Sequence, residues 1–280
     1  MRFRIKPQYM SASLVTLIIV LGEVFFDILG GWGRMALALG AACLTEAVLS
    51  RLLRRVWPNY TSAYISGNSV AILTKPAPGL LWPFCLGSTL AIASKYVLRY
   101  RGRHLWNPTN FSICALLLLA PGSMSILSHQ WSNSPLAVGV IFAVGFIVVT
   151  RAKLLHVTGT YVVAFAVLAA LRAAILGESL WTELAPLTGP MYMLLIFFMI
   201  TDPKTTVRSK AGRVWVTVLI ALAECGIRLM DHWHVPLAAP LLTAPPLFAL
   251  FVVGPAAMWW DLRRRARAEA APRTVPAAAG

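Results

Sequence analysis

The sequence predicts an all-α polytopic membrane protein with about ten transmembrane helices in two inverted repeats of five. Three observations predict this fold: an apolar composition, a regular alternation of apolar runs with basic clusters, and a short motif that occurs twice. Of the 280 residues, 58% are hydrophobic and only 12% are charged, whereas soluble domains carry about 25% charged residues. A soluble fold cannot bury this much apolar surface, so the expected partner is a lipid bilayer.

The positively charged residues fall into six clusters, and the chain between successive clusters is long enough for two membrane crossings. All but four of the 25 Lys and Arg residues belong to these clusters. Because positive residues resist translocation, we place every cluster, and both termini, on the cytoplasmic side of the membrane. The net charge of +15 is then expected to face anionic headgroups, and no nucleic acid is expected as a partner. The clusters are Arg2–Lys6, Arg51–Arg55, Lys95–Arg103, Arg151–Lys153, Lys204–Arg213 and Arg263–Arg273.

The apolar runs between the clusters are the expected helices. The third, fifth and eighth runs are shorter than the roughly 20 residues of a full crossing, and Asn, Pro or Gly bound each of them. Short, interrupted helices mark binding regions in inverted-repeat transporters. The ten expected helices are residues 12–30, 34–50, 60–74, 79–97, 108–121, 135–150, 154–174, 188–202, 213–230 and 236–260.

A short motif, in which Thr-x-Pro follows an apolar run, ends both the third and the eighth expected helix. Its copies are Thr74–Pro76 and Thr201–Pro203, nearly half the chain apart. Five spans separate them, and an odd number means that the copies enter the membrane from opposite sides. We therefore expect one transmembrane domain over residues 1–270 with inverted pseudo-repeats 12–121 and 135–260, followed by a disordered cytoplasmic tail over 271–280.

Acidic residues within apolar runs are candidate functional groups, because a charge inside a membrane is costly. Glu23 and Asp27 share one face of the first expected helix, where they either bind a cation or bond to headgroups and neighbouring helices. Glu46 lies deeper in its run. Glu224 precedes Arg228 by four residues, which favours a structural salt bridge. The four cysteines form no CxxC pair, and we expect no metal site.

Two polar segments at the expected cytoplasmic face, residues 95–111 and 201–213, hold the most informative side chains. Asn107 and Asn110 bracket a proline at a helix entrance, where free backbone N–H groups can receive an anion or the polar edge of a ring. Asp202 ends a helix that the next proline stops. Two interpretations stay open for these segments: capping of helix ends, or a polar pocket for a flavin or an ion.

These segments carry a resemblance to a known family. The chain is similar to the NqrB/RnfD family, whose members include membrane components of the sodium-pumping NADH:quinone oxidoreductase and of the Rnf electron-transport complex. It resembles most the short stand-alone members of this family, including ones associated with enediyne-type biosynthesis. The matching pieces follow the family order over nearly the whole chain: Phe3–Ile5, Gly67–Thr74, Ile92–Lys95, Trp106–Asn110 and Phe197–Thr205.

The resemblance implies an integral membrane electron-transfer subunit of the bacterial cytoplasmic (inner) membrane that passes electrons through flavins and couples this to ion movement. It implies other membrane or redox subunits as partners. Pumping members attach FMN covalently to a Thr in a longer outer loop. Residues 121–135 contain no Thr, so we expect no covalent FMN and at most a noncovalent FMN or riboflavin. The implied cofactor-binding residues are Asn68, Lys95, Asn107, Asn110, Thr201, Asp202 and Thr205.

Two other functions stay open on the sequence. The same scaffold can serve a transporter of a small molecule or ion, working by rocking of its halves, or a membrane anchor for a partner protein. Fold alone does not choose among them. A flavin spectrum distinguishes the first function from the others, and substrate-dependent flux identifies a transporter.

Overall fold

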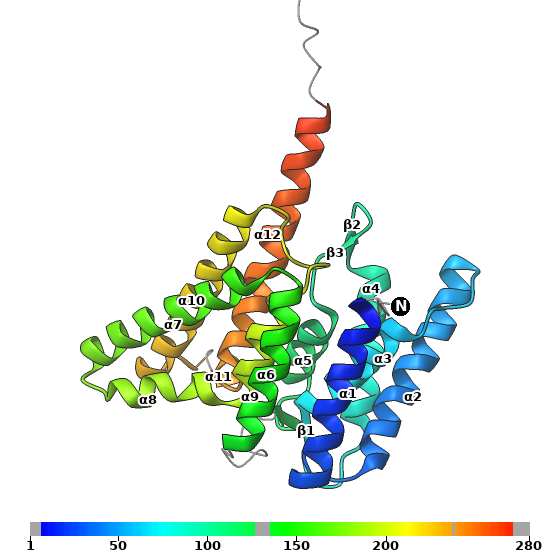
Figure 1. Cartoon of the computed structure of the whole chain (residues 1–280), viewed down its shortest axis with the longest axis horizontal. Coiled ribbons are helices and arrows are strands. Elements are labelled where there is room, and N and C mark those ends of the chain that lie inside the picture. The colour runs from blue at the N-terminus through cyan, green and yellow to red at the C-terminus, as the bar shows by residue number, and fades with distance from the viewer. Residues whose placement is uncertain (1–6, 127–134, 237–238, 271–280) are drawn as a thin grey trace, which may run out of the picture.

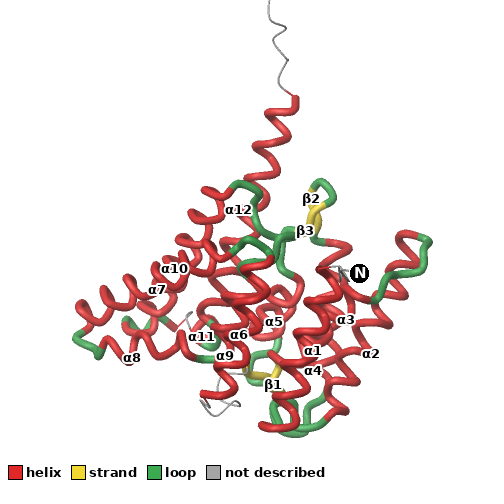
Figure 2. Tube along the Cα trace, in the orientation of Figure 1, coloured by secondary structure: helices red, strands yellow, loops and turns green. Residues whose placement is uncertain are grey.

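The computed structural model describes residues 7–126, 135–236 and 239–270, and nearly all of its elements are helices (Figure 1). Figure 2 shows two small β-ribbons and short loops between them. The helices are α1 (Pro7–Phe26), α2 (Trp32–Leu49), η1 (Ser50–Arg54), α3 (Thr61–Leu73), α4 (Trp82–Val97), α5 (Pro108–Leu119), α6 (Pro135–Arg151), α7 (Leu155–Leu176), α8 (Leu180–Leu184), η2 (Ala185–Thr188), α9 (Pro190–Leu194), η3 (Leu195–Met199), α10 (Lys210–His232), α11 (Ala239–Leu242) and α12 (Pro245–Ala270).

Both ribbons are antiparallel and two-stranded. In the first, β1 (Thr74–Pro76) pairs with β4 (Met124–Ile126), with Lys75 opposite Ser125. This pairing ties the end of α3 to the segment that follows α5. In the second, β2 (Arg99–Tyr100) pairs with β3 (Arg103–His104) in a tight hairpin between α4 and α5. The turn of this hairpin has positive φ at Arg101 and Gly102.

Each of the ten expected segments contains a helix, which confirms the all-α fold. The expected number of ten crossings is not supported by helix length and composition. The reason is that α3, α4 and α5 have only 13, 16 and 12 residues, and α10 carries charged residues along its length. In the described part of the chain, three helices are long and apolar enough to cross a membrane: Trp32–Arg54, Leu155–Leu176 and Pro245–Ala270. A fourth span is added if the two helices Leu180–Thr188 and Pro190–Met199, which meet at a bend of 58°, are counted as one.

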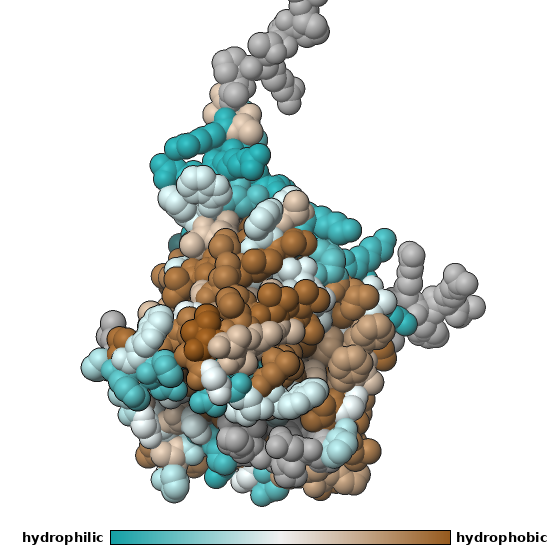
Figure 3. Space-filling model, turned by 90° about the vertical axis from the view of Figure 1, so that its left-hand side faces the viewer, coloured by the Kyte–Doolittle hydropathy of each residue, from teal (hydrophilic) through white to brown (hydrophobic). Residues whose placement is uncertain are grey.

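The basic clusters in the described residues lie toward one end of the molecule. Figure 1 shows η1, the β2–β3 hairpin, the start of α10 and the basic end of α12 on its upper side. The α1–α2 turn, β1 and α8 lie on its lower side. The first cluster, residues 2–6, and the expected tail, residues 271–280, lie outside the described residues. Figure 3 shows the same separation on one face, where a broad hydrophobic band lies beneath a hydrophilic cap.

One hydrophobic core runs through both halves of the chain. In the first half α2 packs on α3 and α4; in the second α7 and α12 pack on α10, and α5 contacts α12 across the halves. Glycine permits two close approaches. A Cβ at Gly67 would lie 3.1 Å from Ala42 Cβ and 3.2 Å from the Ala38 carbonyl, as is typical of small-residue packing between membrane helices. At Gly145 a Cβ would overlap the ring of Phe197.

Candidate functional site

The second polar segment begins where a broken helix ends. Here α9 continues into the π-helical turn η3, and such turns are frequent at functional sites. Thr201 is buried, and its hydroxyl donates to the Phe197 carbonyl at 2.6 Å. The carboxylate of Asp202 then accepts from the Lys204 N–H at 2.9 Å and from the Thr205 hydroxyl at 3.1 Å. These bonds hold the turn closed after the helix.

The first polar segment meets this turn through Asn107. Its Oδ1 accepts from the Asn110 N–H at 3.1 Å, which caps the start of α5. Its Nδ2 donates to the Asp202 carboxylate at 3.3 Å. One asparagine side chain therefore satisfies a helix N-terminus and contacts a segment almost one hundred positions later in the chain. We call Asn107, Asn110, Thr201, Asp202 and Thr205 the polar junction.

Asn110 is the most buried member of the polar junction, with no exposed surface. Its Nδ2 donates to the Leu247 carbonyl of α12 at 2.9 Å. Its Oδ1 is buried without a hydrogen-bond partner. A buried amide oxygen without a donor is costly, and most such groups in native structures are bonded to protein or to ordered water.

Side chains around the polar junction hold its parts in place. Arg103 donates to the carbonyls of Pro203 at 2.9 Å and Lys204 at 3.0 Å, so the β2–β3 hairpin is fastened to the Asp202 turn. Trp106 donates from Nε1 to the Phe251 carbonyl of α12 at 2.9 Å. The ring of Phe251 also stacks on that of Phe111, with centroids 5.9 Å apart. The junction therefore unites the hairpin, α5, the Asp202 turn and α12.

The other two expected site residues occupy separate places. Lys95 is buried near the end of α4, and its Nζ donates to the carbonyl and hydroxyl of Ser62, both at 2.9 Å. It lies within electrostatic range of Asp202, but its hydrogen bonds go to α3 and not to the junction. Asn68 is fully buried in α3, and neither its amide nitrogen nor its oxygen has a partner. The structure thus brings five of the seven expected residues together.

Two side chains at the polar junction or beside it, Asp202 and His104, have shifted pKa values. Desolvation raises the pKa of Asp202, against the opposing effect of the hydrogen bonds from Lys204, Thr205 and Asn107. Burial, together with the nearby charges of Arg99 and other cations, lowers the pKa of His104 to about 4. His104 Nδ1 is also buried without a partner. His104 is therefore neutral near pH 7, although it lies in a strongly basic segment.

The enclosed space beside the junction is small. A cavity of about 20 Å³ lies between Thr205, Thr206, Arg213 and the facing surface of α10 and α12. A single water molecule needs at least roughly 10–15 Å³ of this kind of volume. In this conformation the cavity therefore fits one water and does not fit a flavin ring.

A second buried polar cluster lies in the other part of the chain. Glu224 of α10 is fully buried and pairs with Arg228 at 3.1 Å, as the four-residue spacing predicted. The hydroxyls of Tyr161 and Tyr192 also donate to its carboxylate, and Arg228 donates to Tyr192. Neither tyrosine was predicted from the sequence, because each lies alone in an apolar run and only the fold brings it to Glu224.

Two of the remaining acidic candidates, Glu23 and Glu46, have structural partners, whereas Asp27 is exposed just after the end of α1. Glu23 accepts from the backbone N–H groups of Leu29 at 2.7 Å and Gly31 at 2.8 Å, so it closes the α1–α2 turn. This contact supports the structural interpretation of Glu23. Glu46 accepts from the Tyr96 hydroxyl at 2.6 Å, while its second oxygen is buried without a partner.

Comparison with known proteins adds no family assignment. The chain matches no known family model and no curated protein. The resemblance to the membrane components of the Rnf complex and of NADH:quinone oxidoreductase therefore rests on the sequence pieces that carry it, two of which form the polar junction.

Proposed function

We propose that this protein is an integral membrane electron-transfer subunit with a noncovalent flavin at the polar junction. The observation that carries the proposal is the 3.3 Å contact between Asn107 and Asp202. It joins the two sequence pieces with the best resemblance to flavin-dependent membrane subunits. The proposal includes ten membrane segments in two inverted halves; the presence of a helix in each of the ten expected segments and the single basic end of the molecule support it.

The donor and acceptor groups of the junction suit the polar edge of a flavin ring. Asn110 Oδ1 lacks a donor, and the ring edge of a flavin offers both an N–H donor and carbonyl acceptors. The Thr205 hydroxyl and the Asn107 amide are further hydrogen-bonding groups at the same place. The cavity of about 20 Å³ is too small for the ring, so binding requires the segment from Thr205 to Arg213 to move outward. The flavin would supply the redox chemistry, and the protein would position it.

The test is an absorbance spectrum of the protein purified in mild detergent with riboflavin or FMN supplied during expression. We expect a flavin spectrum that disappears from the protein fraction after denaturation and gel filtration. Asn110→Leu removes the unpartnered oxygen and should lower the bound flavin at least tenfold. Ser125→Ala, beyond the other end of α5, is the matched control and should retain it. A colourless wild-type protein after flavin supplementation would contradict the proposal.

A second function, transport of a small ion across the same scaffold, is favoured by the Glu224 cluster. A buried carboxylate with an arginine and two tyrosines inside a membrane protein points to an ion or proton pathway. Proteoliposomes should then show ion-dependent flux that Glu224→Gln abolishes while the protein still folds. Equal flux in wild type and variant would contradict a transport function for the Glu224 cluster.

A further inference from the structure

The turn after α2 exposes apolar and basic side chains together. We call residues 51–57 the η1 turn; it runs from Arg51 to Trp57, and each of its side chains is exposed. Among its apolar residues, Leu52 is 71% exposed, Leu53 62% and Trp57 74%. Figure 1 shows this turn in light blue at the right-hand edge, at the upper end of α2. Adjacent apolar side chains exposed in this way mark a contact with another protein or with a membrane.

The backbone of the η1 turn is held closed by its own residues. Ser50 is buried, and its hydroxyl donates to the Val56 carbonyl at 3.0 Å. Arg55 follows the π-helical turn with a left-handed φ of 58°, which ends the helix. The exposed side chains therefore project from a closed turn.

Aromatic rings hold two of the three arginines of this turn. The guanidinium carbon of Arg51 lies 4.9 Å from the ring centroid of Trp57, and that of Arg54 lies 4.4 Å from the ring centroid of Tyr96 on α4. Such cation–π contacts position a guanidinium group and leave its charge in place. With Arg55, three positive charges lie within about one turn of the chain.

No carboxylate of the described chain pairs with these charges. The sequence has no Asp or Glu between Glu46 and Glu178. The arginine ion pairs in the described residues involve Arg101, Arg172, Arg228 and Arg265. The arginines of the η1 turn are thus available to an external anion, and the planar guanidinium group matches the geometry of phosphate oxygens.

The η1 turn lies where a membrane surface is expected. It continues directly from Trp32–Arg54, which is long and apolar enough to cross a membrane. Trp57 carries the kind of side chain that concentrates at the boundary between hydrocarbon and headgroups. Segments that lie in this boundary combine basic residues with Trp and Leu, as Arg54, Leu53 and Trp57 do here. The occupant that this position favours is therefore lipid.

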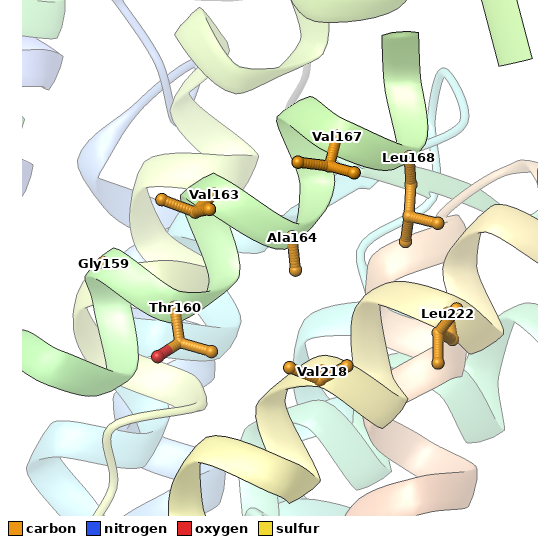
Figure 4. A pocket seen from close by; sticks show the side chains of 8 residues that line it. All are labelled: Gly159, Thr160, Val163, Ala164, Val167, Leu168, Val218 and Leu222. Carbon is orange, nitrogen blue, oxygen red and sulfur yellow. The ribbon is translucent and has the colours of Figure 1, made fainter. Parts of the chain in front are cut away.

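The open groove between α7 and α10 offers a contrast in charge. It has a volume of about 510 Å³, and Figure 4 shows Leu168 of α7 pointing toward Leu222 of α10. No charged residue lines it. Apolar contacts alone do not distinguish one phospholipid headgroup from another, so we expect selection by headgroup charge at the η1 turn and not at this groove.

We propose that the η1 turn is a binding site for the headgroup of an anionic phospholipid in the leaflet at the basic end of the molecule. The phosphate lies against the guanidinium groups of Arg51, Arg54 and Arg55, while Leu53 and Trp57 lie beside the acyl chains. Charge complementarity selects this occupant, because the headgroup of a zwitterionic lipid carries an ammonium that the three arginines repel. The inference goes beyond the proposed function: it depends on the membrane placement of α2 and on no flavin.

The test is quenching of Trp57 fluorescence by brominated lipids in the whole protein reconstituted into nanodiscs. The nanodiscs hold phosphatidylglycerol and phosphatidylcholine, with bromine on the acyl chains of only one of them. Because the chain has ten tryptophans, the Trp57 signal is the difference between each protein and its Trp57→Phe counterpart. Quenching measured over a range of lipid ratios gives the relative affinity of the site for the two lipids.

We expect Trp57 in the wild type to be quenched preferentially by brominated phosphatidylglycerol. Arg54→Gln should lower this preference roughly fivefold, as expected from about 1 kcal/mol for each basic residue near a membrane surface. Replacement of all three arginines of the turn by Gln should remove the preference while Trp57 stays quenched by both lipids. Replacement of the three by Lys, which retains the charges, should preserve most of it.

A matched variant separates this site from the general charge of the basic end. Arg263→Gln, Arg264→Gln and Arg267→Gln together remove three exposed charges of α12 and should leave the preference at Trp57 unchanged. Equal affinity of wild type for the two lipids would overturn the proposal, as would an unchanged preference in the triple variant of the η1 turn. Absence of quenching by either lipid would place the turn in water or against another protein and would also overturn it.

Discussion

At the scale of single residues, Asp202 lies where desolvation disfavours the negative charge of its carboxylate. It accepts three hydrogen bonds, yet desolvation still raises its pKa. A residue that needed only to cap a turn could do so at the surface without this cost. The Asp202 carboxylate therefore holds the turn through its hydrogen bonds while desolvation disfavours its charged form.

Replacement of the Asp202 carboxylate by an amide distinguishes a residue that only caps the turn from one that is needed for bound flavin or activity. Asp202→Asn retains an oxygen for the Lys204 N–H but replaces the oxygen that accepts from Thr205 and Asn107 by an amide nitrogen, so we expect a loss of about 1 kcal/mol in the free energy of unfolding, typical of a lost cap. Bound flavin or electron-transfer activity should be lost. Asp261→Asn is the control, because it removes a carboxylate that pairs with Arg265 at 3.0 Å on α12. Full activity and ligand content in Asp202→Asn would show that the residue is only a cap.

His104 predicts a dependence of stability on pH. Its pKa is about 4 in the folded protein and about 6.5 in an unfolded chain. Between these values the unfolded chain binds a proton that the folded protein excludes, so stability is complete above pH 6.5 and falls as pH decreases toward 4. His104→Gln should reduce the change in melting temperature across this window. His232→Gln, at an exposed position at the end of α10, should leave it unchanged.

At the scale of elements, the contact between α6 and η3 depends on a missing side chain. Phe197 of the π-helical turn fills the space that a Cβ at Gly145 would need. The same turn is followed at once by Thr201, whose hydroxyl bonds the Phe197 carbonyl. The packing of one glycine therefore supports the position of the polar junction.

Two substitutions on the same helix test this dependence. Gly145→Ala overfills the contact and should lower the free energy of unfolding by about 1–3 kcal/mol. Gly139→Ala meets no atom within 4 Å and should stabilise the helix by roughly 0.5–1 kcal/mol. Thermal unfolding in detergent measures both. A Gly145→Ala variant as stable as Gly139→Ala would mean that Phe197 can move aside freely.

At the scale of the whole molecule, the distribution of charge and apolar surface defines two ends and a band. The described basic clusters lie toward one end, and a hydrophobic band lies below them on the face shown in Figure 3. Positively charged ends resist translocation across a membrane. We therefore expect the β2–β3 hairpin on the cytoplasmic side and the α7–α8 turn on the outer side.

Cysteine labelling in whole cells tests this orientation. In a background without the four native cysteines, Glu178→Cys should react with a membrane-impermeant maleimide from outside. Arg101→Cys should react only after the cells are permeabilised. Both positions are exposed, so a difference in labelling reports the side of the membrane. Labelling of Arg101→Cys in intact cells would reverse or refute the topology.

The all-α fold and the places of the helices could be predicted from the sequence because both depend on local properties. Apolar runs, prolines and basic clusters act over one or two turns of the chain, and each expected segment contains a helix. The capping role of Asn107 is local for the same reason. The shortness of α3 and α5, with 13 and 12 residues, is local too, because Asn, Pro and Gly bound the third and fifth runs in the sequence.

The tertiary structure alone decided which polar groups meet. Asn107 reaches Asp202, and Tyr161 reaches Glu224, through contacts between residues far apart in the chain. No periodicity encodes such a contact, because it depends on how several helices pack around a shared core. The open groove between α7 and α10 has the same origin: its residues are visible in the sequence, but only the packing of the two helices places their apolar side chains along one groove.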